Sequence, residues 1–196
     1  MLRLILLVLF VVGSINWLLH ERAVDSGPGV LAPEVPKQTN LVDATPVSLG
    51  EYSLKPLAEF SLDARVLARE NYRWDAGAEL APMDLVLGWG PMSDRAVLEQ
   101  IKITQSARWY RWKVKQFLIP QRAIETHSAN MHLVPANKDV RRAMKSARVG
   151  QLVSLSGQLV EISRADGWRW RSSLTRDDVG GGSCELILVE QIAFVN

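Results

Sequence analysis

The sequence predicts a mainly β (α+β) protein: a small antiparallel barrel with two short helices, preceded by a hydrophobic anchor helix at the N-terminus. Three observations predict this class. The first residues form an apolar run, several later segments alternate apolar and polar residues, and two short stretches carry helix-capping signals. The chain has 196 residues, of which 47% are hydrophobic, so it has room for one ordinary domain plus an appendage.

The apolar run at the N-terminus extends from Leu4 to Leu19 and has three interruptions, at Gly13, Ser14 and Asn16. As a helix it would span roughly 24 Å, slightly less than a ~30 Å hydrocarbon core. We therefore predict that residues 1–22 form a transmembrane anchor or an uncleaved signal. A cleaved signal peptide is the alternative, and cleavage near Ser14 would leave a short apolar region.

The charges beside this run predict its orientation. Arg3 and the α-amino group lie on the short side, whereas Glu21, Arg22 and Asp25 nearly balance on the far side. The positive-inside rule then places the N-terminus in the cytoplasm. We expect a single-pass membrane protein whose soluble domain lies outside the cytoplasm, in the periplasm.

The rest of the chain divides at a change in composition. Residues 23–50 show no sustained period of 2 or 3.6 and contain four prolines, at positions 28, 33, 36 and 46. This composition predicts a semi-extended linker that holds the domain off the membrane surface. Residues 51–196 are predicted to form the soluble, mainly β domain.

Strands and helices follow from periodicity and capping. The pattern predicts strands over 60–68, 84–89, 102–105 and 108–113. Ser93 is expected to cap a helix that runs from Asp94 to about Ile101. A second helix is expected to begin after Asn137 and to end before Gly150.

The last third of the chain carries the clearest β pattern. Six apolar residues between Leu152 and Ile162 surround Gly157, where a strand in a small barrel would bend. Asp166-Gly167 predicts a hairpin turn, and the final strand is expected over Glu185–Val195. A helix followed by this strand, a hairpin and a closing strand resembles the OB-type barrel.

Basic and aromatic residues concentrate in one stretch. From Lys102 to Arg148, eleven basic residues face only two acidic ones, and Trp109-Tyr110-Arg111-Trp112 lies within it. Trp168-Arg169-Trp170-Arg171 is a second such motif. A cationic surface with stacking groups could bind an anionic polymer, lipid headgroups or a partner protein, while the expected compartment disfavours nucleic acid. The alternative is ordinary packing, with the tryptophans in the core and the arginines in water. The candidate binding residues are Arg108, Trp109, Arg111, Trp112, Lys113, Arg169 and Arg171.

A thiol enzyme is the competing hypothesis. Cys184 is the only cysteine and follows a glycine loop, with His127 and His132 upstream as candidate bases. An anchored, β-barrel hydrolase or transpeptidase of this kind would be similar to a sortase. However, the Thr-Leu-x-Thr-Cys block of that family is absent, and no arginine follows Cys184. The structural alternative is a small core residue at the head of a strand.

Metal binding and cofactors are not predicted, because a separation of five residues puts the two histidines on opposite sides of a strand. The sequence therefore favours a membrane-tethered, extracytoplasmic binding or assembly module over an enzyme.

Overall fold

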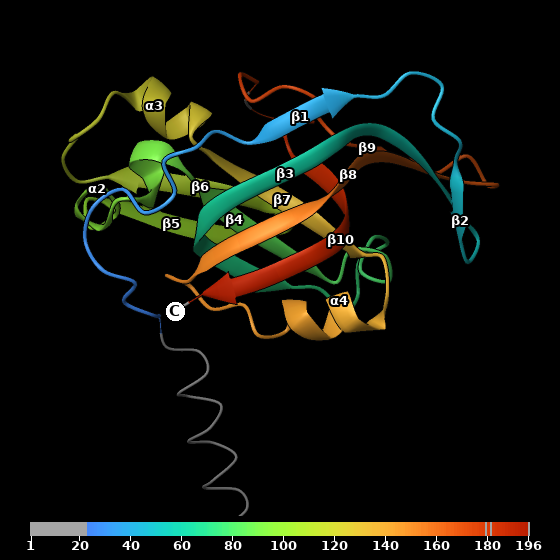
Figure 1. The fold of residues 1–196 in the computed structure, drawn as a ribbon, viewed down its shortest axis with the longest axis horizontal. Coiled ribbons are helices and arrows are strands. Elements are labelled where there is room, and N and C mark those ends of the chain that lie inside the picture. Colours follow the sequence, from blue (N-terminus) through green and yellow to red (C-terminus); the bar gives the residue numbers. More distant parts are fainter. Residues whose placement is uncertain (1–22, 179, 181, 196) are drawn as a thin grey trace, which may run out of the picture.

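The computed structural model describes residues 23–178, 180 and 182–195 (Figure 1). The predicted anchor, residues 1–22, lies outside the described residues and stays a prediction. Within the described part of the chain, no helix is long and apolar enough to cross a membrane. The described residues are mostly β, which confirms the predicted β-rich class.

Ten strands and four short helical segments follow one another along the described residues. The strands are β1 (Lys37–Asn40), β2 (Val47–Leu49), β3 (Tyr52–Asn71), β4 (Met83–Gly88), β5 (Ile101–Ser106), β6 (Trp109–Val114), β7 (Ser128–Pro135), β8 (Leu152–Arg164), β9 (Arg169–Arg171) and β10 (Glu185–Val195). The helical segments are η1 (Gly90–Ser93), α2 (Arg95–Leu98), α3 (Gln121–Thr126) and α4 (Lys138–Met144).

Eight of these strands form one mixed sheet, while β5 and β6 make a separate two-stranded hairpin (Figure 1). The pairings run from β3 through β4, β7, β10 and β8, and β8 pairs with β3 again. Of these pairings, only β7 with β10 is parallel. The ladder of paired strands therefore returns to the strand on which it began.

The main hydrophobic cluster is built from these same five strands. The predicted alternation of Phe60, Leu62, Ala64 and Val66 is confirmed in β3, whose alternate residues enter this cluster. Residues of β4, β7, β8 and β10 join them, because successive side chains of a strand point to opposite sides and one side of each strand faces the same interior.

Gly157 of β8 allows close contact with the neighbouring strand. A Cβ atom at this position would lie 2.0 Å from the carbonyl oxygen of Leu188, a distance that no side chain tolerates. The register between β8 and β10 shifts directly afterwards, between Val189 and Gln191. The irregularity expected at this glycine is therefore present, and backbone proximity explains the residue.

The two predicted helices have different outcomes. The second is confirmed: the Asn137 side chain accepts hydrogen bonds from the backbone amides of Asp139 and Val140, and α4 follows. The first is shorter than predicted, and its cap is wrong. Asp94 caps α2, whereas the Ser93 hydroxyl oxygen accepts the backbone amides of Leu31 and Ala32.

The expectation of a semi-extended linker over residues 23–50 that holds the domain at a distance is also corrected. Strands β1 and β2 both pair with β3, and Ala32 is 2% exposed. Val24 donates its backbone N–H to the carbonyl oxygen of Val149 at 2.7 Å. Backbone hydrogen bonds to remote segments thus hold this proline-rich stretch against the domain, although its composition is that of a linker.

Candidate functional site

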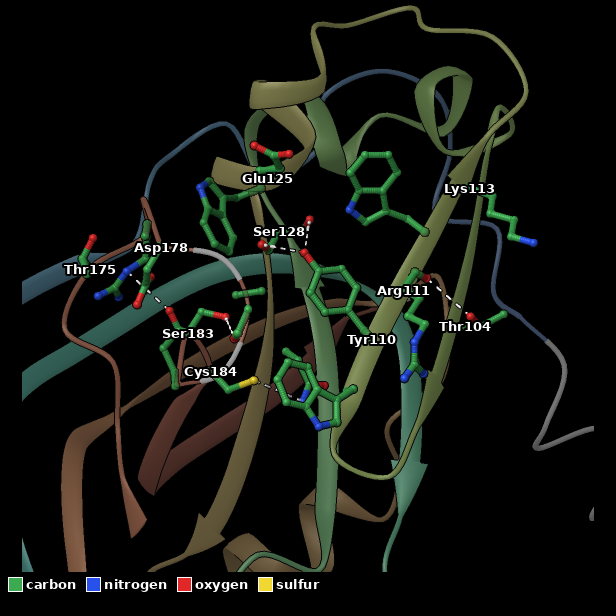
Figure 2. A pocket seen from close by; sticks show the side chains of 18 of the residues that line it. Thr104, Tyr110, Arg111, Lys113, Glu125, Ser128, Thr175, Asp178, Ser183 and Cys184 are labelled. Atoms are coloured by element: carbon green, nitrogen blue, oxygen red, sulfur yellow. Dashed lines mark hydrogen bonds and ion pairs between the residues drawn. The ribbon is translucent and has the colours of Figure 1, made fainter.

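A cavity of about 730 Å³ lies between the β5–β6 hairpin, the start of β7 and the segment 175–185. Figure 2 shows Tyr110 of the hairpin on one side and Ser183, Cys184 and Asp178 on the other. The volume falls in the range of sites for small molecules, which are concave and combine apolar walls with a few placed polar groups. This cavity is the candidate functional site.

The pairing of β5 with β6 gives the hairpin two distinct faces. Ile103 lies opposite Trp112, and with Tyr110 these side chains pack partly buried against the cluster around Met92 and Ile124. The Tyr110 hydroxyl lies 3.3 Å from the Ser128 hydroxyl, and burial raises the pKa of this tyrosine. The aromatic face of the hairpin is thereby held against the body of the protein, where it lines the cavity.

The opposite face of the hairpin is exposed and cationic. Lys102 lies opposite Lys113, Thr104 lies opposite Arg111, and Trp109 follows on the same side. Figure 2 shows the Lys113 side chain directed away from Ser128 and Cys184. Of the predicted binding residues, the structure thus brings Trp109, Arg111 and Lys113 together on this face, with Trp112 on the other. All four contribute to the wall of the cavity.

Arg108 lies apart from this exposed face. Its guanidinium group contacts Asp84 at 2.7 Å and Asp75 at 2.8 Å, and its side chain is 16% exposed. It also lies 3.7 Å from the centre of the Tyr72 ring. The side chain that the sequence assigned to ligand binding therefore fixes the turn of the hairpin to the sheet.

The carboxylate of Asp84 is the centre of a buried polar cluster. Asp84 is fully buried, and His132 Nδ1 lies 2.9 Å from its Oδ2 atom, although the alignment is too poor for a hydrogen bond. The Asn130 amide donates to the backbone oxygen of Arg108 at 3.0 Å. The His132 ring also lies against Trp170, at 4.7 Å between ring centres. His132 thus belongs to the packing between β7 and β9.

The remaining predicted binding residues lie on β9. Arg169 and Arg171 both form ion pairs with Glu161 of the adjacent strand. Trp168 and Trp170 are partly buried against the cluster that includes Leu54 and Leu186. This arrangement has tryptophans inward and arginines outward, and neither arginine lines the cavity.

Cys184 lines the cavity, but the candidate bases do not. The side-chain amide of Asn130 lies 3.9 Å from the Sγ atom of Cys184. His127 instead directs Nδ1 toward the backbone oxygen of Ala123, at 3.0 Å, and His132 lies beside Asp84. Burial raises the pKa of the Cys184 thiol to about 11. The described contacts do not form the thiol–base pair that nucleophilic catalysis requires.

We expect Cys184 to resist alkylation in the folded protein. A pKa raised from 9.0 to about 11 lowers the thiolate fraction at neutral pH about a hundredfold, and the thiolate is the reactive species. Iodoacetamide at pH 7.4 should label the native chain far more slowly than the chain unfolded in urea, as followed by mass spectrometry. Similar rates in the two states would restore the thiol-enzyme hypothesis.

Two carboxyl groups in the cavity wall lack partners for one oxygen each. Glu185 is 1% exposed, and among the described residues its Oε2 atom has no hydrogen-bond partner; the same is true of Asp178 Oδ1. Arg176 approaches Glu185 Oε1 through Nε at 3.4 Å. Burial outweighs this cation and raises the pKa of Glu185 to about 8. A buried carboxyl with a free oxygen in a cavity is a typical functional group.

Sequence reasoning missed these two residues. Asp178 follows Asp177 in a loop, and a position in a loop gives no information about the direction of a side chain. Glu185 carried a usable signal: it alternates with Ile187 and Val189, both in the interior cluster, so strand periodicity places its side chain on the inner face.

Among the described residues, no three His, Cys, Asp or Glu side chains gather closely enough to hold a metal ion. No protein-family model, no curated protein and no solved structure matches the chain.

Proposed function

We propose that this chain is a membrane-tethered, extracytoplasmic binding module and that the cavity behind the β5–β6 hairpin is its ligand site. The observation that carries the proposal is the nearly fully buried Glu185 carboxyl, which lines the cavity with one oxygen unpartnered. Leaving a buried acceptor unsatisfied costs about 1–3 kcal/mol. A ligand that donates a hydrogen bond would offset this cost.

We propose in addition that the five strands β3, β4, β7, β8 and β10 form an OB-type barrel. The support is the ladder that returns to β3, its single parallel pairing and the position of α4 between β7 and β8. Barrels of this type bind ligands on loops and strand faces, and the cavity lies beside two inter-strand segments. The fold supports a binding role without naming the ligand.

The docked N-terminal segment bears on the tethering proposal. Val24 bonds to Val149, and the Ser26 hydroxyl donates to the Gly150 carbonyl at 2.7 Å. With residues 1–22 as the anchor, the domain would lie directly next to the bilayer and not at the end of a long tether. The exposed hairpin face around Lys102, Arg111 and Lys113 would then approach an anionic surface or partner.

A ligand screen with a blocked cavity tests the binding proposal. We expect at least one class among sugars, amino acids, nucleotides, polyamines, carboxylates and inorganic phosphate to raise the thermal midpoint of the full chain in detergent micelles, because ligands that bind only the folded state stabilise it. Ser183 lines the cavity, so Ser183→Trp should abolish the shift.

Ser146 provides a matched control. Its hydroxyl also donates to the carbonyl oxygen three residues earlier, as that of Ser183 does, but it lies exposed after α4. Ser146→Trp should therefore keep the ligand-induced shift. A library that leaves the midpoint unchanged, or a shift that survives Ser183→Trp, would refute the cavity as the site.

A further inference from the structure

The chemistry of the cavity wall narrows the class of ligand. The wall contains the aromatic rings of Trp89, Tyr110 and Trp112 and the charged groups of Arg176, Asp178 and Glu185. Three further cationic residues and one acidic residue also line it, namely Lys102, Arg111, Lys113 and Glu125. Tyr110 is held through its hydroxyl at Ser128, so its ring is fixed before a ligand arrives. Preformed aromatic walls favour ligands with flat, weakly polar faces.

The unpartnered polar atoms of the wall are two carboxyl oxygens. Glu185 Oε2 and Asp178 Oδ1 are both buried and without a partner among the described residues. The other oxygen of Asp178 already accepts a hydrogen bond from the Ser173 hydroxyl at 2.7 Å. Because burial raises the pKa of Glu185 to about 8, its carboxyl group keeps its proton at neutral pH and can donate as well as accept. A ligand that satisfies this wall must therefore donate to Asp178 and hydrogen-bond with Glu185.

The guanidinium group of Arg176 disfavours a cationic donor. It lies between Glu185, which its Nε atom approaches at 3.4 Å, and Gln38, which accepts from Nη2 at 2.6 Å. An ammonium group at Glu185 would lie beside this fixed positive charge. An anionic ligand such as a carboxylate or phosphate would instead bring acceptors to the unpartnered Asp178 oxygen, which needs a donor. A neutral group that donates avoids both mismatches.

Hydroxyl groups meet these requirements, because each one both donates and accepts. We infer that the cavity binds a carbohydrate, whose hydroxyl groups hydrogen-bond with Glu185 and Asp178 while its ring faces pack on Tyr110 and Trp112. This inference rests on the proposed binding function and names the ligand class of the same site. The cavity of about 730 Å³ is of ordinary size for such a ligand.

Titration of the full chain in detergent micelles tests the inference. The probes are glucose, N-acetylglucosamine and their linear oligomers of two to four units, with intrinsic tryptophan fluorescence and calorimetry as readouts. We expect saturable binding of at least one of them. Asp178→Asn should weaken the affinity about tenfold, because hydrogen bonds to a charged group are stronger than those to a neutral one. Glu185→Met should weaken it by a similar factor, because it removes the hydrogen-bonding group altogether.

The adjacent aspartate is the matched control. The Asp177 side chain is 81% exposed and pairs with Arg122 outside the cavity, so Asp177→Asn should leave the affinity within about twofold of wild type. Because both cavity variants are close in shape to the native residues, circular dichroism and the thermal midpoint should confirm that each is folded.

The outcomes separate this inference from the proposed function. Stabilisation by spermidine, citrate or phosphate, with no response to any sugar, would overturn the carbohydrate assignment and keep the cavity as a binding site. If neither the sugars nor any other member of the library raises the thermal midpoint, both the carbohydrate assignment and the cavity as a binding site are overturned. Sugar binding that Asp178→Asn and Glu185→Met leave unchanged would also overturn the assignment, because the two carboxyl groups would then play no part.

Discussion

Arg108→Ala should destabilise the folded protein by about 3–5 kcal/mol, because it leaves the carboxylate of Asp84 buried without its cation. Asp84 is fully buried, and Arg108 contacts it at 2.7 Å. The variant also removes the contact of the guanidinium group with Asp75 and with the ring of Tyr72. Urea unfolding, followed by tryptophan fluorescence, gives the free energy of unfolding that checks this value.

Arg122 is the control for this substitution. It also pairs with two carboxylates, Glu125 and Asp177, but its side chain is 52% exposed. Exposed ion pairs contribute about 0–1 kcal/mol, so Arg122→Ala should have a small effect. Equal decreases in the free energy of unfolding for the two variants would show that the burial of Asp84 does not strengthen its ion pair with Arg108. Adding Asp84→Asn to Arg108→Ala should recover part of the loss, since it removes the uncompensated charge.

The fate of Arg108 shows where sequence reasoning ends. Its neighbours Trp109 and Arg111 suggested one exposed cationic surface. The alternation of side chains along a strand cannot show that the side chain of a residue at the strand end packs against the rest of the domain. Arg108 has a φ angle of 67°, outside the β region, and its partners Asp75 and Asp84 lie more than twenty residues earlier. Only the paired strands reveal that contact.

The sequence predicted structure correctly where the structure depends on residues close together in the chain, as in a helix cap or the alternation along a strand. Asn137 caps α4, and the alternation in β3 is confirmed, because both depend on neighbours within a few positions. The segment 23–50 was misjudged for the opposite reason. Its prolines and glycines describe a linker, whereas β1 takes its order from pairing with residues 58–61 of β3. The candidate cavity, built from the hairpin and a loop more than sixty residues later, was likewise out of reach.

Glu185 should make the folded protein less stable as the pH rises. Burial raises the pKa of its carboxyl group from 4.5 to about 8 in the folded protein. Between these two values the unfolded chain releases the proton while the folded protein keeps it. Raising the pH therefore favours unfolding, by up to about 1.4 kcal/mol for each pH unit. The stabilisation is complete below about pH 4.5 and is lost as the pH approaches 8.

Comparison of variants isolates this contribution. The side chain introduced by Glu185→Gln cannot ionise, so the free energy of unfolding of this variant lacks the loss that ionisation causes in wild type. The difference between the two values should therefore grow in favour of the variant from pH 5 to pH 8, as measured by urea unfolding at each pH. Glu190→Gln changes an exposed carboxyl on the same strand and should follow the wild-type curve. Parallel curves for wild type and Glu185→Gln would mean that Glu185 ionises as readily in the folded chain as in the unfolded one. The cavity would then hold an ionised carboxylate at neutral pH, and Glu185 would meet a ligand only as an acceptor.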